Sequence, residues 1–350
     1  MKRINTKFIS FSIKLIVTVF IVLLVLYFIS PVFVPKWNTK EDNYVGTNIS
    51  GLYAEPKNSI DVLYVGNSSV FCGISPMEIW NEYGLTGYDI AVGSSRPWTE
   101  YYMIKNVLRE QLPKMIVLNV DCAFDSDETE EVYLRKAYDH INMSSEKMEA
   151  IFSEAYHNDG LESLSYIIPT FRYHDRWSEL KGDDFRLAYA NNASINRGYD
   201  LYIEAKPYAG NPDYFNQVSG DELLSQKSIE YLDLIIDLCN KNDIKLIFTV
   251  IPSTESWNYE KHGIINEYCA SHGIQFVDMN TDKMISSIGI DWNNDTCDGG
   301  IHLNYSGAAK TSKYIGAIIS QELGPLNHDS ETENRWNADY QSYLMGKEIA

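Results

Sequence analysis

Short apolar runs alternate with amphipathic segments along most of this chain. Five runs are rich in β-branched and aromatic residues, which is typical of buried strands. The segments between them carry apolar residues at helical spacing. The predicted strands are 60–65, 88–92, 115–120, 244–251 and 274–279, and the predicted helices are 98–112, 143–155, 161–168, 223–239, 257–271 and 306–323.

Alternating strands and helices predict an α/β fold, in which helices cover both faces of a parallel sheet. In such a sheet, ligands bind at the carboxyl ends of the strands. Polar turns at 66–69 and 93–95, and Asp121, directly follow three of the predicted strands. The stretch 123–218 is long, polar and poor in strand signals, so we interpret it as an insertion.

The N-terminal region contains the longest apolar run. Residues 15–35 are 21 consecutive uncharged positions, and at about 1.5 Å per residue they span a hydrocarbon core of roughly 30 Å. Four cations and no acid precede this run: Lys2, Arg3, Lys7 and Lys14. The positive-inside rule therefore predicts an uncleaved anchor with the following domain outside the cell. The alternatives are a buried core helix and a cleaved signal peptide, although no small-x-small cleavage pattern follows.

These patterns predict the domain organisation. We expect a basic cytoplasmic tail at 1–14, a transmembrane anchor at 15–35 and a linker at 36–58. A single α/β domain at 59–324 would follow, with the insertion at about 123–218, and residues 325–350 would form a polar tail.

Composition narrows the classes of partner. The formal net charge is −19 and the isoelectric point is about 4.7, which argues against a nucleic-acid partner because polyanions require a cationic face. The five cysteines form no C-x-x-C pair and no Cys/His cluster with zinc spacing. We expect neither a metal nor a cofactor.

The first candidate for chemistry is the turn at 66–69, directly after a predicted buried strand. A serine on such a turn can expose its hydroxyl above the sheet, and the N–H groups that open the next helix can stabilise an oxyanion. The alternative is that Ser68 or Ser69 only caps that helix.

The second candidate is the glycine-rich loop at 298–304, just before the last predicted helix. A serine nucleophile needs a base within hydrogen-bond reach, and the base needs an acceptor that fixes its tautomer. Asp298 and His302 could supply both from one loop. The alternative is a surface loop in which Asp298 and Asn304 cap the last helix.

Together the two blocks resemble the SGNH/GDSL hydrolase superfamily over roughly residues 60–323, and especially its membrane-anchored branch. In that branch the first block reads G-[SN]-S-[SH] and the last reads D-G-G-x-H-L-N-x-x-G-A. The resemblance implies a three-layer α/β/α sandwich with a five-stranded parallel sheet. It also implies Ser68 as nucleophile, His302 as base and Asp298 as the group that orients it. The backbone N–H of Gly93, together with that of Ser68, would form the oxyanion hole.

The sequence departs from the family pattern at two positions. Family members usually place the aspartate three residues before the histidine, whereas Asp298 is four before His302. Asp295, seven residues before His302, is the alternative orienter. The third family block, G-x-N-D, is absent, and only Asn119 at the end of the third predicted strand offers a weak substitute donor.

The segment 171–177 places cationic side chains between aromatic ones. One interpretation is a substrate-binding edge formed by His174 and Arg176. The alternative, which we favour slightly, is a structural cluster in which Trp177 is buried and Arg176 pairs with an acid.

The resemblance implies a membrane-anchored esterase or O-acyltransferase that acts on acyl esters of cell-surface carbohydrate polymers. The expected partners are such a polymer, the bilayer around residues 15–35 and a multi-span membrane acyltransferase. The alternative function is a non-catalytic scaffold of the same fold within a polysaccharide-acylation complex. Neither the acyl group nor the acceptor follows from the sequence.

Overall fold

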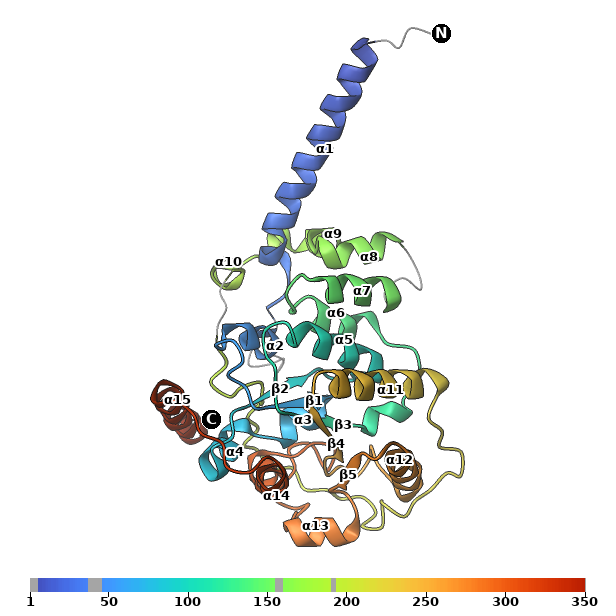
Figure 1. The fold of residues 1–350 in the computed structure, drawn as a ribbon, viewed down its shortest axis with the longest axis vertical. Coiled ribbons are helices and arrows are strands. Elements are labelled where there is room, and N and C mark those ends of the chain that lie inside the picture. Colours follow the sequence, from blue (N-terminus) through green and yellow to red (C-terminus); the bar gives the residue numbers. More distant parts are fainter. Residues whose placement is uncertain (1–5, 37–45, 155–159, 190–192, 350) are drawn as a thin grey trace.

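The computed structural model of the chain describes residues 6–36, 46–154, 160–189 and 193–349. Five parallel strands form one sheet in the order β2-β1-β3-β4-β5. Helices cover both faces of this sheet (Figure 1), so the predicted three-layer α/β/α sandwich is confirmed. The strands are β1 (Val62–Gly66), β2 (Gly87–Ala91), β3 (Met115–Asn119), β4 (Lys245–Val250) and β5 (Gln275–Asp278).

Each face of the sheet has its own hydrophobic core, because successive strand residues point to opposite faces. Leu63 and Val65 pack with α5 (Pro97–Val107), α11 (Gln226–Lys241) and α12 (Tyr259–His272). Val62 and Tyr64 pack on the other face with α3 (Ser68–Gly73), α4 (Pro76–Tyr83), α13 (Asp282–Ile288) and α14 (Tyr305–Leu323). Burial on both faces explains why the central strands are continuous apolar runs.

The sheet has its topological switch point between β1 and β3. β1 pairs with β2 on one side and with β3 on the other, so the connections that follow β1 and β3 leave the sheet in opposite directions. This strand order places ligand sites at the carboxyl ends of β1 and β3. Ser68 directly follows the turn after β1, and Asp121 follows β3.

The predicted insertion is helical in its first half. In Figure 1 its helices lie between the sheet and the base of the N-terminal helix. They comprise η2 (Asp121–Phe124), α6 (Glu131–Tyr138), α7 (Ser145–Glu154), α8 (Gly160–Ile167), α9 (Thr170–Tyr173), η4 (His174–Ser178) and α10 (Gly182–Leu187). Residues 193–225, which the structure describes in full, contain neither helix nor strand.

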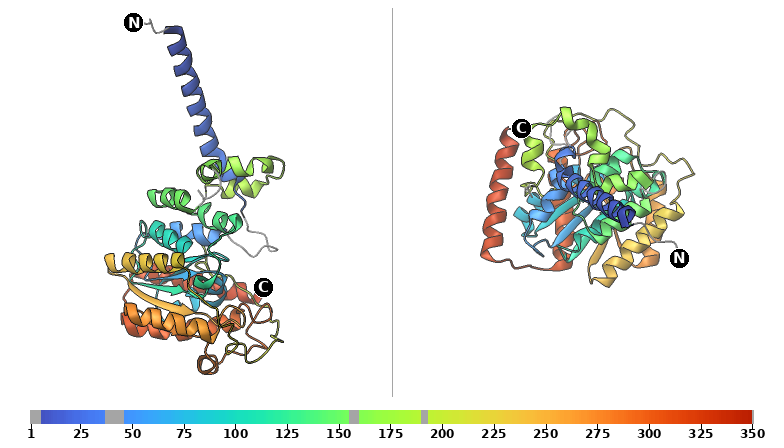
Figure 2. Two further views of the ribbon diagram at one scale, coloured as in Figure 1. Left: turned by 90° about the vertical axis from the view of Figure 1, so that its right-hand side faces the viewer. Right: turned by 90° about the horizontal axis from the view of Figure 1, so that it is seen from above.

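A single long helix, α1 (Thr6–Phe33), projects from the domain (Figures 1 and 2). Its segment Lys7–Phe33 has a mean hydropathy of 2.8 over its most apolar window, and only 11% of that window is buried. The helix is therefore long and apolar enough to cross a membrane. It begins inside the region predicted as a cytoplasmic tail, at Thr6 rather than Leu15.

Two predicted domain boundaries were wrong. The described part of the 36–58 linker contains α2 (Gly46–Ser50) and η1 (Gly51–Ala54), with Ile49 and Leu52 buried in the core. The predicted polar tail at 325–350 contains the helix α15 (Ser330–Ile349), which lies along one side of the domain (Figure 2). This helix buries Trp336 and Tyr343 completely and lacks an apolar stripe, so its sequence reads as polar.

Candidate active site

The turn after β1 presents Ser68 at the start of α3. Gly66 has a φ of +156°, and a Cβ at this position would lie 2.7 Å from Val70 Cγ2 and 2.9 Å from Asn119 Cβ. Only glycine fits this turn. Asn67 caps the helix by accepting the Ser69 N–H at 2.9 Å. Neither serine is therefore the cap, and the Ser68 hydroxyl is left for another partner.

The loop before α14 folds back on itself. Gly299 and Gly300 have φ angles of +92° and +109°, which side chains other than glycine rarely adopt. Thr296 and Leu303 pair as an antiparallel bridge that closes the loop. Because the chain reverses here, Asp298 Oδ1 accepts the backbone N–H of His302 at 2.8 Å.

The structure brings Ser68, His302 and Asp298 into one hydrogen-bonded series. His302 Nδ1 lies 2.5 Å from Asp298 Oδ2, and His302 Nε2 lies 2.8 Å from Ser68 Oγ. Burial opposes ionisation of Asp298, but its hydrogen bonds with His302 outweigh this effect and lower the pKa of the carboxyl below its usual value. Asp298 is thus a carboxylate at neutral pH, placed to stabilise a protonated imidazole.

Asp295, the alternative orienter, has other partners. Its side chain is fully buried, and Oδ2 lies 2.5 Å from Lys310 Nζ and 2.7 Å from the Asp291 N–H. Its carbonyl accepts the N–H of Asn304 at 3.0 Å. Asp295 therefore fixes the base of the loop, whereas Asp298 contacts the imidazole. Asn304 caps α14 by accepting the N–H groups of Ser306 and Gly307, so the capping interpretation holds for Asn304 and not for Asp298.

The hydroxyl of Ser69 points into the protein toward Asp121. Ser69 Oγ donates to Asp121 Oδ2 at 3.0 Å, and Asn67 Nδ2 donates to Asp121 Oδ1 at 2.8 Å. Burial raises the pKa of Asp121 in spite of these donors. Asp121 thereby ties the turn that bears Ser68 to the end of β3. Sequence reasoning noted Asp121 only as a polar residue at a strand end and did not assign it this positioning contact.

Two backbone N–H groups, on the loops after β1 and β2, are candidates for an oxyanion hole. Val92 N–H bonds to the Gly66 carbonyl at 3.1 Å, which sets the loop after β2 against the nucleophile turn. The N–H groups of Ser68 and Gly93 have no hydrogen-bond acceptor among the described residues. A Cβ on Gly93 would meet only one atom, 3.9 Å away in Tyr133. Both N–H groups are thus available to a bound oxyanion.

The amide of Asn119 is committed elsewhere. It is fully buried, and Nδ2 donates to Asp121 Oδ1 at 2.8 Å and to Asn67 Oδ1 at 3.2 Å. Both amide hydrogens therefore hold the nucleophile turn from below. We leave Asn119 out of the candidate oxyanion hole for this reason.

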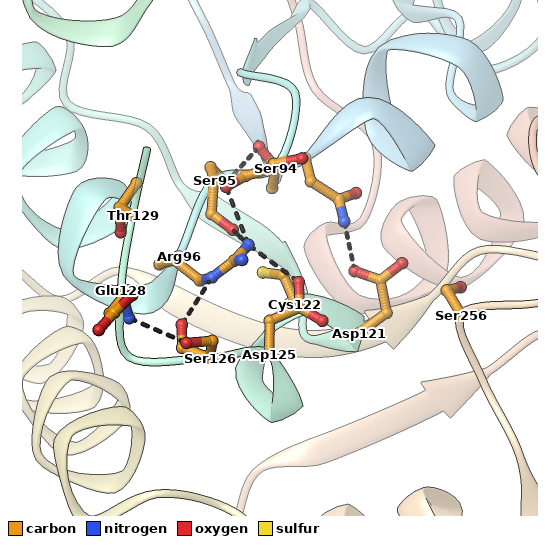
Figure 3. A network of polar contacts seen from close by, with 12 residues as sticks. Ser94, Ser95, Arg96, Asp121, Cys122, Asp125, Ser126, Glu128, Thr129 and Ser256 are labelled. Atoms are coloured by element: carbon orange, nitrogen blue, oxygen red, sulfur yellow. Dashed lines mark hydrogen bonds and ion pairs between the residues drawn. The ribbon is translucent and has the colours of Figure 1, made fainter. Parts of the chain in front are cut away.

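Buried polar groups support the loop after β2, and Figure 3 shows the neighbouring contacts of Arg96. Ser95 Oγ lies 3.0 Å from the Gly66 carbonyl and 2.6 Å from Glu100 Oε1, and Cys122 Sγ donates to the same carboxyl oxygen at 3.3 Å. Burial raises the pKa of Glu100 to about 7. Arg96 links this loop to the loop after β3 through an ion pair with Asp125 at 2.9 Å.

The end of the insertion borders the loop at 298–304. Lys206 N–H bonds to the Thr296 carbonyl at 2.8 Å, and Tyr305 N–H bonds to the Tyr202 carbonyl at 2.7 Å. A Cβ on Gly300 would lie 2.8 Å from Tyr208 Cδ2. The segment 202–208 therefore lies against the loop that carries His302. No sequence motif marked this segment, because the contacts are made largely by its backbone.

The structure places His174 and Arg176, the candidate substrate-binding residues, in contact with their own neighbours and not with the series around Ser68. Arg176 donates to the carbonyl of Phe33 at the end of α1 and pairs with Asp184 at 3.1 Å. His174 is exposed and its ring contacts the Phe171 carbonyl at 3.3 Å. Both residues lie in η4, which contacts α1. As the structural alternative predicts, Arg176 pairs with an acid. The same alternative predicts a buried Trp177, but this side chain is 71% exposed.

Among the residues that the structure describes, no group of three or more His, Cys, Asp or Glu side chains has the arrangement of a metal site. All five cysteines are free thiols, and four of them are buried. Burial raises the pKa of the half-buried Cys297 thiol, which lies next to Asp298, to about 12. The thiol is thus protonated at neutral pH and is a poor nucleophile compared with a thiolate.

Comparisons with known proteins give no close relative. No family model matches the chain, and no curated protein matches it. A candidate acylhydrolase from Bacteroides fragilis is 13% identical with a TM-score of 0.37, and the match covers 77% of this chain and 91% of that one. A GDSL-like lipase from Bacteroides thetaiotaomicron is 11% identical with a TM-score of 0.36, covering 79% of this chain and 97% of the other. These similarities are too weak to support a functional conclusion.

Proposed function

We propose that this chain is a serine-dependent acyl-ester enzyme of the SGNH/GDSL type. The observation that carries the proposal is the series from Ser68 Oγ through the His302 imidazole to the Asp298 carboxylate. It lies at the carboxyl end of β1, beside the topological switch point of the sheet. A nucleophile, a base and an orienting carboxylate in this order are what acyl transfer through serine requires.

The geometry supports a two-step reaction. His302 Nε2 takes the proton of Ser68 as Oγ attacks the ester carbonyl, and the resulting oxyanion accepts the N–H groups of Ser68 and Gly93. Collapse of this intermediate breaks the bond to the leaving alcohol, which takes the proton from His302. Water or a sugar hydroxyl then gives its proton to His302 and attacks the acyl-enzyme. The second collapse returns the proton to Ser68.

We further propose that α1 anchors the domain at the outer face of a membrane. The uncharged run at 15–35, the cations before it and the low burial of α1 support this placement. The substrates would then be acyl esters of cell-surface carbohydrate polymers. A multi-span membrane acyltransferase that supplies acyl groups is the proposed partner. The proposed chemistry requires no metal and no cofactor.

Hydrolysis of p-nitrophenyl acetate by the full chain in detergent tests the enzyme proposal. Ser68→Ala should lower the turnover number by at least about a thousandfold, because it removes the nucleophile. Ser69→Ala is the matched control, since it deletes the same atom from the neighbouring residue. Equal activity in wild type and Ser68→Ala would instead favour the non-catalytic scaffold.

A further inference from the structure

A cavity lies at the base of α1, between that helix and the helices of the insertion. Its volume is about 310 Å³. Apolar groups from α1 and from the insertion form much of its wall, among them Tyr27, Phe28, Pro31, Ile167 and Leu187. Tyr27 and Phe28 are also 38% and 59% exposed on the outer surface of α1. The wall of the cavity is thus continuous with the apolar surface of the helix.

Two lysines line this cavity without an acidic partner. Lys147 is only 5% exposed, and its ammonium donates to the Ile141 carbonyl at 3.3 Å. The Lys36 ammonium donates to the Pro31 carbonyl. Neither forms an ion pair with a carboxylate in the described part of the chain. Burial lowers the pKa of both lysines to about 8, so an anion that neutralised them would relieve a desolvation cost.

The nearest carboxylates are already occupied. Asp139, which itself lines the cavity, accepts Arg135 Nη1 at 3.4 Å and the Tyr173 hydroxyl at 2.7 Å. Asp184 pairs with Arg176 and accepts the Lys181 N–H. Burial lowers the pKa of His140, which also lines the cavity, to about 3. The cavity therefore holds excess positive charge within a chain whose net charge is −19.

The cavity lies at the level where lipid headgroups would be. Lys14 and Lys36 bracket the uncharged residues 15–35, and a helix of about 20 residues spans the hydrocarbon core. Lys36 therefore falls at the outer headgroup layer if Lys14 lies at the inner one. Exposed aromatic side chains surround the base of α1, as is typical of a membrane interface. These are Phe171, Trp177, Phe185 and Tyr189, with exposed fractions of 40%, 71%, 59% and 67%.

Hydrogen bonds between the insertion and α1 fix the base of this helix against the domain. Thr170 Oγ1 lies 2.7 Å from Ser30 Oγ, and the Tyr189 hydroxyl donates to the Phe28 carbonyl. In Figure 1, α8, α9 and α10 gather around the base of α1, at the end of the domain from which that helix leaves. An apolar groove that opens onto α1 and ends at the buried Lys147 and the half-buried Lys36 matches a molecule with an acyl chain and an anionic head.

We propose that this cavity binds the phosphate headgroup of an anionic membrane lipid through Lys36 and Lys147, with the acyl chains lying along α1. The inference rests on the anchorage proposed above and not on the chemistry of Ser68. A lipid phosphate, rather than free phosphate, fits because most of the cavity wall is apolar and continuous with the exposed surface of the helix.

Native mass spectrometry of the full chain in detergent micelles, titrated with phosphatidylglycerol, tests the site. The double variant Lys36→Gln/Lys147→Gln should bind roughly thirtyfold more weakly, since each interfacial lysine contributes about 1 kcal/mol to the attraction of an anionic lipid. Lys241→Gln, an exposed lysine of α11, is the control and should bind as wild type does. Lys36→Arg should retain binding because it keeps the charge.

Equal binding by wild type and the double variant would overturn the site. Competition by inorganic phosphate distinguishes the two sources of the anion. Complete displacement of phosphatidylglycerol by an equal concentration of phosphate would overturn the lipid assignment. Labelling of Ser68 by a fluorophosphonate, measured in the same samples, should be unchanged in the double variant. A wild-type chain that binds the lipid but is not labelled would refute the proposed enzyme function and leave this inference standing.

Discussion

His302 Nε2 lies 2.8 Å from Ser68 Oγ, although 234 residues separate the two in the chain. β1 and its turn supply the serine, and the loop before α14 supplies the histidine. The contact is short enough for direct proton transfer between the two groups. Ser69, the adjacent serine, has its hydroxyl 3.0 Å from buried Asp121 instead.

This difference predicts which serine reacts. A fluorophosphonate probe should label the full chain, and the label should be lost in Ser68→Ala. Ser69→Ala should remain labelled, because its hydroxyl faces Asp121 and not His302. The measurement is in-gel fluorescence of the two variants at equal loading. Labelling that survives in Ser68→Ala but disappears in Ser69→Ala would reverse the assignment.

The two aspartates near His302 should differ in their effects on turnover. Asp298→Asn should lower it by roughly 10²–10⁴-fold while the fold is retained, because the imidazole loses the acceptor that fixes its tautomer. Steady-state ester hydrolysis measures this effect, and circular dichroism reports whether the fold is intact.

Asp295→Asn provides the comparison. It removes the buried partner of Lys310 and should lower the melting temperature. Its turnover at a temperature where it stays folded should be close to that of wild type. A crippled Asp295→Asn beside a nearly active Asp298→Asn would show that the orienting residue has been misassigned.

The buried Glu100 predicts a pH dependence of stability. Burial raises its pKa in the folded chain from 4.5 to about 7. Between pH 4.5 and pH 7, Glu100 therefore keeps a proton in the folded chain that it has lost in the unfolded chain. The corresponding stability is fully present below about pH 4.5 and is lost as the pH rises through 7, a change of about 3 kcal/mol. Wild type should therefore melt at a lower temperature at pH 8 than at pH 5.

Glu100→Gln tests the origin of that dependence. The amide mimics the protonated acid, so the difference in melting temperature between pH 5 and pH 8 should shrink in this variant. It should not vanish, because burial also raises the pKa of Asp200 to about 7. An undiminished difference in Glu100→Gln would mean that Glu100 is ionised in the folded chain throughout this range.

The sequence predicts the sheet well because its strands are buried on both faces. All five predicted strands are present, with boundaries shifted by at most a few residues, and their ends bear the polar residues that meet around Ser68. The pattern of apolar and polar residues was less informative for segments whose structure depends on a few long-range contacts. α15 depends on Trp336 and Tyr343, two aromatic residues one heptad apart in an otherwise polar segment.

His174 and Arg176 show a second limit of prediction from the sequence. A cluster of cationic and aromatic residues looks the same in sequence whether it faces a substrate or another part of the chain. Arg176 binds the Phe33 carbonyl, 143 residues away, and only the three-dimensional structure reveals that contact. The long-range pairing of Asp121 with Asn67 and Ser69 was hidden for the same reason.

One membrane pass with the domain outside is the expected topology. Four cations precede the uncharged run at 15–35, and Lys7–Phe33 is long enough to span a bilayer. Protease added to intact cells should therefore degrade the part of the chain that follows residue 36. A cytoplasmic marker protein in the same cells is the control for lysis. Complete protection of the domain while the cells remain intact would refute this topology.

We predict that the acyl group passes to a polymer hydroxyl more often than to water. The acyl-enzyme at Ser68 is common to both outcomes, and only the acceptor differs. The proposed anchor helix would hold the site near the membrane face, where an acyl donor supplied by a membrane partner would arrive. A freely acting esterase gains nothing from that restriction. With a net charge of −19, the chain would be repelled by anionic wall polymers, so anchorage or a membrane partner must position it.

Wall-polymer acylation should therefore fall in cells that carry Ser68→Ala in place of wild type, with Ser69→Ala cells as the control. A rise in acylation in Ser68→Ala cells would mean that the enzyme removes acyl groups, and the hydrolase would replace the transferase.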